Sequence, residues 1–215
     1  MFIKIEQKSE HKVPKRNSRP FVSVARGAEM FRELLSYRRL YRDDDEFFTM
    51  GEMWEDLASD IDEVSIKFFE DRDGECLKRA GVIHFDGRTT LVLPQSSLTK
   101  AKRGSRFVNF TLAHEFSHVA LGHHDDKPRI MNFQLSDEMI RKNLPPTVEE
   151  YEANLGAIFL QCGVALFDTT LSPATLAARA YTEEHYVKNA MRICRLNEFR
   201  QELEKLAQDR PRVVL

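Results

Sequence analysis

The sequence predicts an α+β fold in which a small sheet precedes a larger helical body. The dipeptide Asp86-Gly87 separates two short apolar stretches, 82–85 and 89–93, which is a strong signal for a β-hairpin. Downstream, apolar residues recur at helical spacing over 107–123 and 148–167. Hydrophobic residues make up 42% of the 215 positions, so the chain can bury a substantial core.

Ahead of the hairpin, the sequence predicts an extended N-terminus, two helices and one strand. Residues 1–20 contain Pro14 and Pro20, which block a regular helix. Apolar residues then recur first at helical spacing and afterwards in alternation, which predicts in turn two helices and a strand: 27–41, 51–61 and 64–68.

After the hairpin, we expect a polar, basic connection over 95–106 and then the helix 107–123. Pro128 and the pair Pro145-Pro146 frame a less regular segment before the helix 148–167. Two shorter helices follow, near 173–180 and 183–207. These elements predict three parts. Residues 1–24 form a basic N-terminal extension, 25–170 form the main domain, and 171–215 form a helical segment that packs on it.

Charge and composition exclude several classes of protein. Lys and Arg number 32 against 34 Asp and Glu, so the chain lacks the positive charge of a dedicated nucleic-acid binder. No apolar run reaches the roughly 18 residues of a membrane span, and the polar N-terminus does not resemble a signal peptide. The three cysteines are far apart and odd in number, which argues against a disulfide framework and favours a reducing, cytoplasmic setting.

One stretch combines helical spacing with metal-binding chemistry, the pattern His-Glu-x-x-His at 114–118. Residues four apart lie on one face of a helix, so His114 and His118 can present both imidazoles to one ion. Glu115 can take a proton from an attacking water without being a ligand. Apolar neighbours surround the motif, and no Pro or Gly interrupts it before Gly122, so the site would lie on a rigid helix. The pattern predicts a catalytic zinc site.

A catalytic zinc site needs a third protein ligand, and the sequence offers several. We favour Glu150 on the next long helix, because Asn154 one turn further could hydrogen-bond the free ring nitrogen of a ligand histidine. His124 lies ten residues after His114, the metzincin spacing, but the glycine that this pattern requires stands one position late. The remaining candidates are two acids beside Glu150: Glu149 and Glu152.

The motif and its surroundings resemble the ImmA/IrrE family of zinc metallopeptidases. The stretch FTLAHEFSHVALGHH is similar to one motif helix of that family, and EEYEANLGAIFLQ is similar to another. The resemblance covers about residues 25–200. It implies zinc bound by His114, His118 and Glu150, with Glu115 as the catalytic acid/base. It also implies a zincin-like helical core with a small antiparallel sheet and trailing C-terminal helices.

The function that this resemblance implies is that of a cytoplasmic zinc metalloendopeptidase. Its protein substrate would be a helix-turn-helix transcriptional repressor or a similar regulator. The alternative is a non-catalytic, metal-bearing regulatory module that binds a transcription factor or DNA. Glu115 favours the peptidase, since a purely structural site has no need of it. We expect no membrane association and no direct binding of nucleic acid, and the sequence does not predict the oligomeric state.

The chain departs from the family pattern at three places. Ser117 stands where glycine is usual, and Gly156-Ala157 replaces the usual Phe-Ala. The run Gln161-Cys162-Gly163-Val164 stands where the family usually has Leu-Met-Pro. These changes bear on the surroundings of the site and leave the metal-binding residues themselves intact.

Three further features have both a functional and a structural interpretation. The strand 89–93 is either an edge strand that pairs with a peptide substrate or part of an ordinary core hairpin. The segment 175–193 has the rhythm of a helix-turn-helix, but its balanced charge favours core packing. Four side chains are available as oxyanion stabilisers, although we expect packing or surface roles for each of them: Tyr151, Tyr181, His185 and Tyr186.

Overall fold

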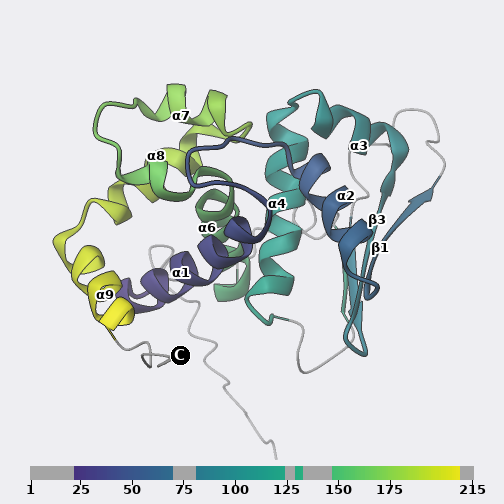
Figure 1. The fold of residues 1–215 in the computed structure, drawn as a ribbon, viewed down its shortest axis with the longest axis horizontal. Helices are drawn as coiled ribbons and strands as arrows, with labels where there is room; N and C mark the ends of the chain where they lie inside the picture. Colours follow the sequence, from purple (N-terminus) through teal and green to yellow (C-terminus); the bar gives the residue numbers. More distant parts are fainter. Residues whose placement is uncertain (1–21, 70–80, 124–128, 133–146, 209–215) are drawn as a thin grey trace, which may run out of the picture.

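The computed structural model describes residues 22–69, 81–123, 129–132 and 147–208, and it confirms the α+β class. The sheet lies at one end of the molecule and the C-terminal helices at the other (Figure 1). Between them, α4 (Arg106–Ala120) packs on α6 (Val148–Cys162). Residues 1–21, most of the predicted N-terminal extension, lie outside the described residues.

The sheet has four strands in the order β1-β3-β2-β4. The predicted hairpin is confirmed as β2 (Gly81–Phe85) and β3 (Arg88–Pro94), which pair antiparallel. Asp86 and Gly87 join them with φ of 50° and 71°, the left-handed conformation that a tight hairpin turn requires. β1 (Val64–Phe69), however, pairs with β3 in parallel, so the sheet is mixed, and the prediction of a purely antiparallel sheet is wrong.

The position of β3 decides between the two interpretations of the strand 89–93. β4 (Arg129–Asn132) pairs with β2, so the hairpin is flanked by β1 on one side and β4 on the other. β3 therefore hydrogen-bonds to a neighbour along both edges, and it cannot accept a peptide substrate as an edge strand. The structure supports the interpretation of 89–93 as part of a core hairpin. The strand β4 itself falls in the segment that the sequence analysis expected to be irregular.

The first helices begin close to their predicted positions. α1 (Val24–Tyr41) starts three residues earlier than expected, because the Ser23 hydroxyl accepts a hydrogen bond from the Arg26 backbone. α2 (Met50–Asp60) begins at a capping box between Thr49 and Glu52. α3 (Gln95–Lys102) was not predicted: its segment is mostly polar, and the few apolar residues that it buries, such as Leu98, pack toward α2.

The two long helices that were predicted after the hairpin are both present but shorter. α4 ends at Ala120 rather than His123. α6 ends at Cys162, where Gly163 adopts a φ of 51° and the chain continues as a 3₁₀ helix, η2 (Gly163–Phe167). A Cβ at position 163 would lie 2.9 Å from Nε of the buried Arg38, so a larger residue would be crowded as well as strained.

The C-terminal segment forms three helices rather than two. α7 (Pro173–Arg179) is followed by α8 (Glu184–Cys194) and α9 (Asn197–Gln208), so the helix expected over 183–207 is interrupted at Arg195 and Leu196. α8 packs against α7 and α6, and α9 packs against α1. The pair α7–α8 buries an apolar face, in agreement with the prediction of core packing: Leu176, Ala177, Val187, Ala190 and Met191.

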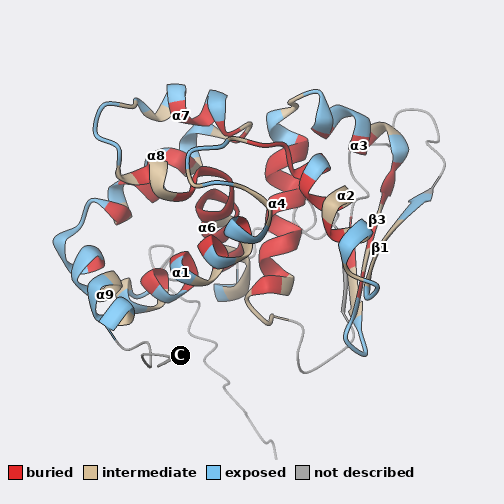
Figure 2. Cartoon of the chain, in the orientation of Figure 1, coloured by how far each residue is buried: buried red, intermediate tan, exposed pale blue. Residues whose placement is uncertain are grey.

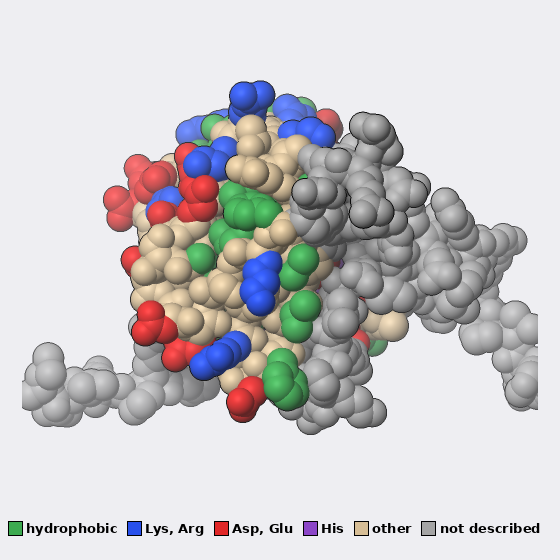
Figure 3. Space-filling view, turned by 90° about the vertical axis from the view of Figure 1, so that its right-hand side faces the viewer, with side chains coloured by type: hydrophobic (Ala, Val, Ile, Leu, Met, Phe, Trp, Pro, Cys, Tyr) green, Lys and Arg blue, Asp and Glu red, His purple; other side chains and the backbone are tan. Residues whose placement is uncertain are grey.

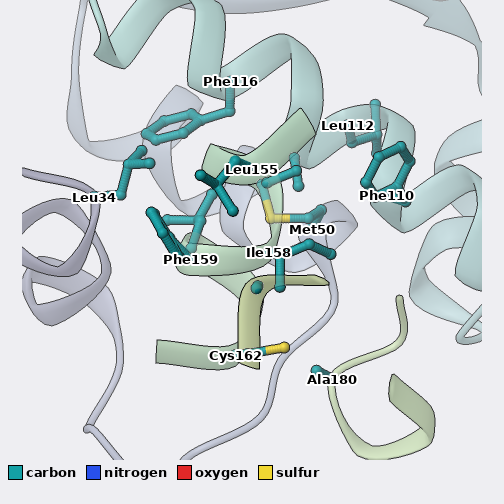
Figure 4. Close-up of a cluster of buried hydrophobic side chains, with 14 of the residues drawn as sticks. Leu34, Met50, Phe110, Leu112, Phe116, Leu155, Ile158, Phe159, Cys162 and Ala180 are labelled. Atoms are coloured by element: carbon teal, nitrogen blue, oxygen red, sulfur yellow. The ribbon is translucent and has the colours of Figure 1, made fainter. Parts of the chain in front are cut away.

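The core lies between the helices, and α4 and α6 are its most deeply buried elements (Figure 2). Close to this pair, aromatic rings from distant parts of the chain meet edge to face, as where Phe31 contacts Phe159 with centroids 5.2 Å apart. Figure 4 shows the apolar cluster that surrounds Phe159, which includes Leu34, Phe116 and Ile158. This packing holds the two helices that carry the predicted metal ligands.

The end of the molecule that carries the sheet has a mixed surface. Apolar side chains there are interspersed with Lys and Arg, while acidic side chains gather toward one side (Figure 3). Two aromatic residues of the sheet are among those exposed, Phe68 and Phe85. Among the described residues, none of the helices combines the length and hydropathy that a membrane crossing requires.

Candidate metal centre

The predicted ligand pair lies on the buried face of α4. His118 is fully buried and His114 is 9% exposed. Their Nε2 atoms are 3.1 Å apart, as expected for side chains one helical turn apart that point to the same place. The helix that holds them is itself anchored, because Trp54 donates a hydrogen bond to the backbone oxygen of Leu112 and Phe116 packs against Trp54.

Glu150 completes the group from the first turn of α6. The Thr147 hydroxyl caps this helix by accepting a hydrogen bond from the Glu150 backbone. The Glu150 carboxylate reaches both histidines, with Oε2 3.4 Å from Nε2 of His114 and Oε1 3.6 Å from Nε2 of His118. The three side chains that the sequence analysis favoured therefore form one group that could hold a metal ion, with ligand atoms within 4.8 Å of one another.

The spacing of these atoms fits a tetrahedral ion. Ligands about 2.0–2.1 Å from a zinc ion, at tetrahedral angles to one another, are about 3.3 Å apart. The observed separations of 3.1, 3.4 and 3.6 Å bracket this value. Two imidazole nitrogens and a carboxylate oxygen also form a set of donors typical of catalytic zinc sites with an open fourth position. The residues present thus fit a zinc ion without rearrangement of the helices.

The other candidates for the third ligand do not join this group. Glu152 points to Arg26 and His123, with which it forms hydrogen bonds of 2.8 to 3.3 Å. Residues two apart on a helix face about 200° away from each other, which explains why Glu150 and Glu152 cannot share one ion. Glu149 is not part of the group as the described residues define it. His124 lies outside the described residues.

Asn154 lies where the sequence analysis predicted it. Its Oδ1 atom is 3.1 Å from Nδ1 of His114, so the amide oxygen accepts a hydrogen bond when that nitrogen carries the proton. This arrangement leaves the Nε2 lone pair of His114 free to point at the ligand group. One turn of α6 thus supplies both a candidate ligand, Glu150, and a residue placed to orient a second candidate, His114.

His118 has a different set of outer partners, which the sequence analysis missed. Its Nδ1 atom lies 2.9 Å from Nδ1 of His123, and Nε2 of His123 lies 3.1 Å from the Glu152 carboxylate. Arg26 on α1 holds the same carboxylate through Nε and Nη2. Although burial alone would raise the pKa of the Glu152 carboxyl, these hydrogen bonds lower it below its ordinary value.

Glu115 is buried next to the ligand group, with 3% of its surface exposed. Burial, reinforced by the neighbouring Glu150 carboxylate, raises its pKa to about 7, against the opposing effect of His114. Its Oε2 atom has no hydrogen-bond partner within the described structure. A buried carboxylate oxygen without a protein partner is costly, and a catalytic role is one of the explanations for such a group. A strongly shifted pKa beside metal-binding side chains favours that explanation here.

The electrostatic field at the ligand group favours a cation. Burial would lower the pKa of His114, but the carboxylates of Glu150 and Glu115 outweigh this effect and raise it above its ordinary value. The same carboxylates that favour a proton on the imidazole would favour a divalent ion between the ligands, since both interactions are with positive charge. Electrostatics and spacing therefore point to the same chemistry.

An aromatic stack forms one border of the site. Tyr186 of α8 lies parallel to Phe110 of α4, with centroids 4.4 Å apart, and Phe110 contacts the ring of His114. Burial raises the pKa of Tyr186, and the carboxylates of Glu183 and Glu150 add to the shift. Of the four oxyanion candidates, Tyr186 is therefore the one with a described connection to the ligand group, although its packing on Phe110 agrees with the predicted structural role.

Ser117 and Gly156 face each other across the α4–α6 contact. A Cβ at Gly156 would lie 3.0 Å from both Cβ and Oγ of Ser117. Because position 156 carries no side chain, the two helices can approach closely at Ser117, beside the candidate ligands.

In comparisons with known proteins, no family model matches this chain and no curated protein matches its sequence. The arguments for function therefore rest on the residues and their geometry.

Proposed function

We propose that this protein is a zinc-dependent metalloendopeptidase that cleaves a protein substrate. The observation that carries the proposal is the convergence of His114, His118 and Glu150 beside the buried Glu115, whose Oε2 atom has no hydrogen-bond partner among the residues that the structure describes. The resemblance to the ImmA/IrrE peptidases supports the same conclusion and suggests the substrate, a helix-turn-helix transcriptional repressor or a similar regulator. We further propose that the protein acts in the cytoplasm.

Each residue of the group has a separate role in this proposal. His114, His118 and Glu150 would hold the metal and leave its fourth position open. A bound zinc ion supplies Lewis-acid chemistry, which polarises the scissile carbonyl and makes a water acidic near neutral pH. Asn154 keeps the ring of His114 in the orientation that binding requires.

Glu115 moves the proton. A carboxyl group whose pKa is about 7 can accept a proton from the attacking water and return it to the leaving amine at neutral pH. Its burial keeps bulk water away, so the proton passes between the reacting groups rather than to solvent. The positive charge of a neighbouring metal would lower this pKa and keep the carboxylate ionised as the base.

The proposal is tested by incubating the zinc-loaded protein with candidate repressor proteins and measuring the masses of the fragments. The wild type should cut one of them at a defined bond. Glu115→Gln should bind about one zinc ion per chain but cut at least 100-fold more slowly, because general base catalysis is worth roughly 10²–10⁴ in rate. Glu150→Gln should lose both zinc and cleavage, whereas Glu149→Gln, which removes the same charge from the same helical turn, should retain both.

Two outcomes would contradict the proposal. Cleavage that persists in Glu115→Gln at the wild-type rate would remove Glu115 from the mechanism. Tight binding of an intact regulator by wild type and Glu115→Gln alike, without fragments, would instead support a non-catalytic regulatory module.

A further inference from the structure

Nδ1 of His118, the ring nitrogen that faces away from Glu150, begins a series of hydrogen-bonded side chains that connects α4, α6 and α1. His123, just beyond the end of α4, lies next to His118 and reaches Glu152 of α6. The Glu152 carboxylate in turn accepts hydrogen bonds from Arg26 of α1, at 2.8 Å from Nη2 and 3.1 Å from Nε. Arg26 and Glu152 are 126 positions apart in the sequence. The series thus connects a ligand histidine to the first helix of the fold.

When both imidazoles are neutral, hydrogen bonding runs along this series of side chains in one direction. Glu152 is a carboxylate held by Arg26, so it accepts, and Nε2 of His123 must carry the proton that it donates. In a neutral imidazole, Nδ1 of His123 is then an acceptor, and Nδ1 of His118 must donate to it. The Nε2 lone pair of His118 is therefore free to face Glu150 and His114, as metal binding requires.

The opposite direction would be unfavourable at both ends. If His123 donated to His118 through Nδ1, its Nε2 would present a lone pair to the Glu152 carboxylate at 3.1 Å. Nε2 of His118 would then carry a proton and could not bind a metal. The charge of Glu152, fixed by Arg26, thus selects the tautomer of a histidine two steps away.

The series is shielded from solvent where this selection takes place. The exposed fraction of the side chain is 0% for His118, 7% for His123 and 10% for Glu152. Water therefore competes little for these hydrogen bonds, and they are stronger than their equivalents on the surface. Within the described ranges, the outer partner of His114 is the neutral amide of Asn154, so the two ligand histidines are oriented by different means.

We propose that His123, supported by Glu152 and Arg26, is a positioning residue that fixes the tautomer and ring orientation of His118 for metal binding. This inference rests on the metal site proposed above. It predicts that His123 controls metal affinity although it is not a ligand, since loss of such outer partners weakens metal binding about 10–100-fold.

The test measures zinc affinity by competition with a chromophoric chelator, for the full chain and three variants. His123→Leu removes the acceptor and should weaken zinc binding about 10–100-fold. His123→Asn keeps an acceptor, because its Oδ1 is bonded to Cγ as the imidazole Nδ1 is, and it should bind zinc within a few-fold of wild type. Glu152→Gln keeps the shape of the side chain but loses its charge. Its zinc affinity should lie between those of His123→Leu and His123→Asn. His84→Leu, a histidine on β2 that pairs with Thr89, is the matched control and should leave zinc affinity unchanged.

The outcomes separate this inference from the proposed metal site. If wild type binds no zinc, the metal site itself is refuted. If wild type binds tightly and His123→Leu matches it, only the positioning role is refuted. Equal weakening in His123→Leu and His123→Asn would also overturn it, because a purely structural role would not be rescued by an acceptor. Unfolding curves recorded with excess chelator show whether each variant is folded. Should His123→Leu fail to fold, unchanged zinc affinity in Glu152→Gln would overturn the inference, and weakened affinity would support it.

Discussion

The same two helices, α4 and α6, bury two sets of side chains with opposite energetics. The apolar set packs around Phe159 and stabilises the fold as it removes apolar surface from water: Leu112, Phe116, Leu155, Ile158 and Phe159. The polar set brings carboxylates and imidazoles close together, with His114, Glu115 and His118 buried and Glu150 and Asn154 partly buried. Burial of charge costs free energy unless it is compensated.

The two sets differ in what they contribute, since the apolar set stabilises the fold and the polar set forms the candidate metal site. The apolar set is stabilised by its own packing. In the polar set, Oε2 of Glu115 has no hydrogen-bond partner in the described part of the chain, and the electrostatic field favours a cation. We therefore expect substitutions in the apolar set to change the free energy of unfolding and not metal affinity. Substitution of His114, His118 or Glu150 should change metal affinity, whereas substitution of Glu115 should leave the metal bound and, in the metal-free protein, raise the free energy of unfolding.

The largest effect should come from the apolar set. Phe159 is fully buried and contacts the rings of Phe31 and Phe199. Phe159→Ala should lower the free energy of unfolding by about 3–5 kcal/mol through lost burial and a new cavity. Urea unfolding in excess chelator measures this loss. Zinc affinity of the folded variant should stay within about three-fold of wild type, and a 100-fold drop would show that the two sets are not separate.

The next effect comes from the polar set and depends on pH. The pKa of Glu115 is about 7 in the folded protein, against an ordinary value of 4.5. Between these values the folded carboxyl binds a proton that the unfolded one has released, so the stability of the metal-free protein falls as pH rises from about 4.5 to 7. Glu115→Gln removes this penalty. At pH 8 and in excess chelator, its free energy of unfolding should exceed that of wild type by roughly 1–3 kcal/mol.

The control for this prediction is the same comparison at pH 4. Both folded and unfolded forms of Glu115 are then largely protonated, so wild type and Glu115→Gln should differ little. Parallel stability profiles from pH 4 to 8 would contradict the prediction. They would show that Glu115 ionises in the folded protein as readily as in the unfolded one.

The polar set could be predicted from the sequence because its geometry is mostly local. His114 and His118 are one helical turn apart, and so are Glu150 and Asn154, so each pair follows from helical spacing alone. The only long-range assumption was that α4 and α6 lie side by side, which the structure confirms. The hairpin turn at Asp86 and Gly87 was predictable for the same reason, since its signal lies in two adjacent residues.

The features that the sequence did not predict depend on contacts between residues far apart in the chain, which leave no local sequence pattern. The parallel pairing of β1 with β3 places Ile66 beside Leu91. This register depends on which face of the assembled sheet is buried and not on the sequence of β1 alone. The partnership of Arg26 with Glu152 joins α1 to α6, and nothing near either residue indicates it. α3 was missed because packing against α2 stabilises a segment whose own sequence is mostly polar.

The smallest effect tests the boundary between the two sets, at the contact of Gly156 with Ser117. Alanine favours a helix over glycine by about 1 kcal/mol, so Gly156→Ala should stabilise α6 in isolation. In the protein, its Cβ would lie 3.0 Å from Ser117 Cβ and from Leu34 Cδ1, tighter than ordinary contact. Leu34 can rotate away, but Ser117 Cβ is fixed to α4. We therefore expect the helices to move apart, with a net loss of about 1 kcal/mol in stability.

Movement of the helices should also reach the ligands, because Glu150 comes from α6 and both histidines come from α4. Zinc affinity of Gly156→Ala should fall a few-fold, and Ser117→Gly in the same chain should restore it. Ser117→Gly alone provides the control, since its own cost to the helix affects folding rather than zinc binding. A double-mutant cycle on zinc affinity should give a coupling of about 1 kcal/mol between the two positions. A coupling near zero would mean that the ligands tolerate this shift, and that the close contact of Ser117 with Gly156 serves only the packing of the apolar set.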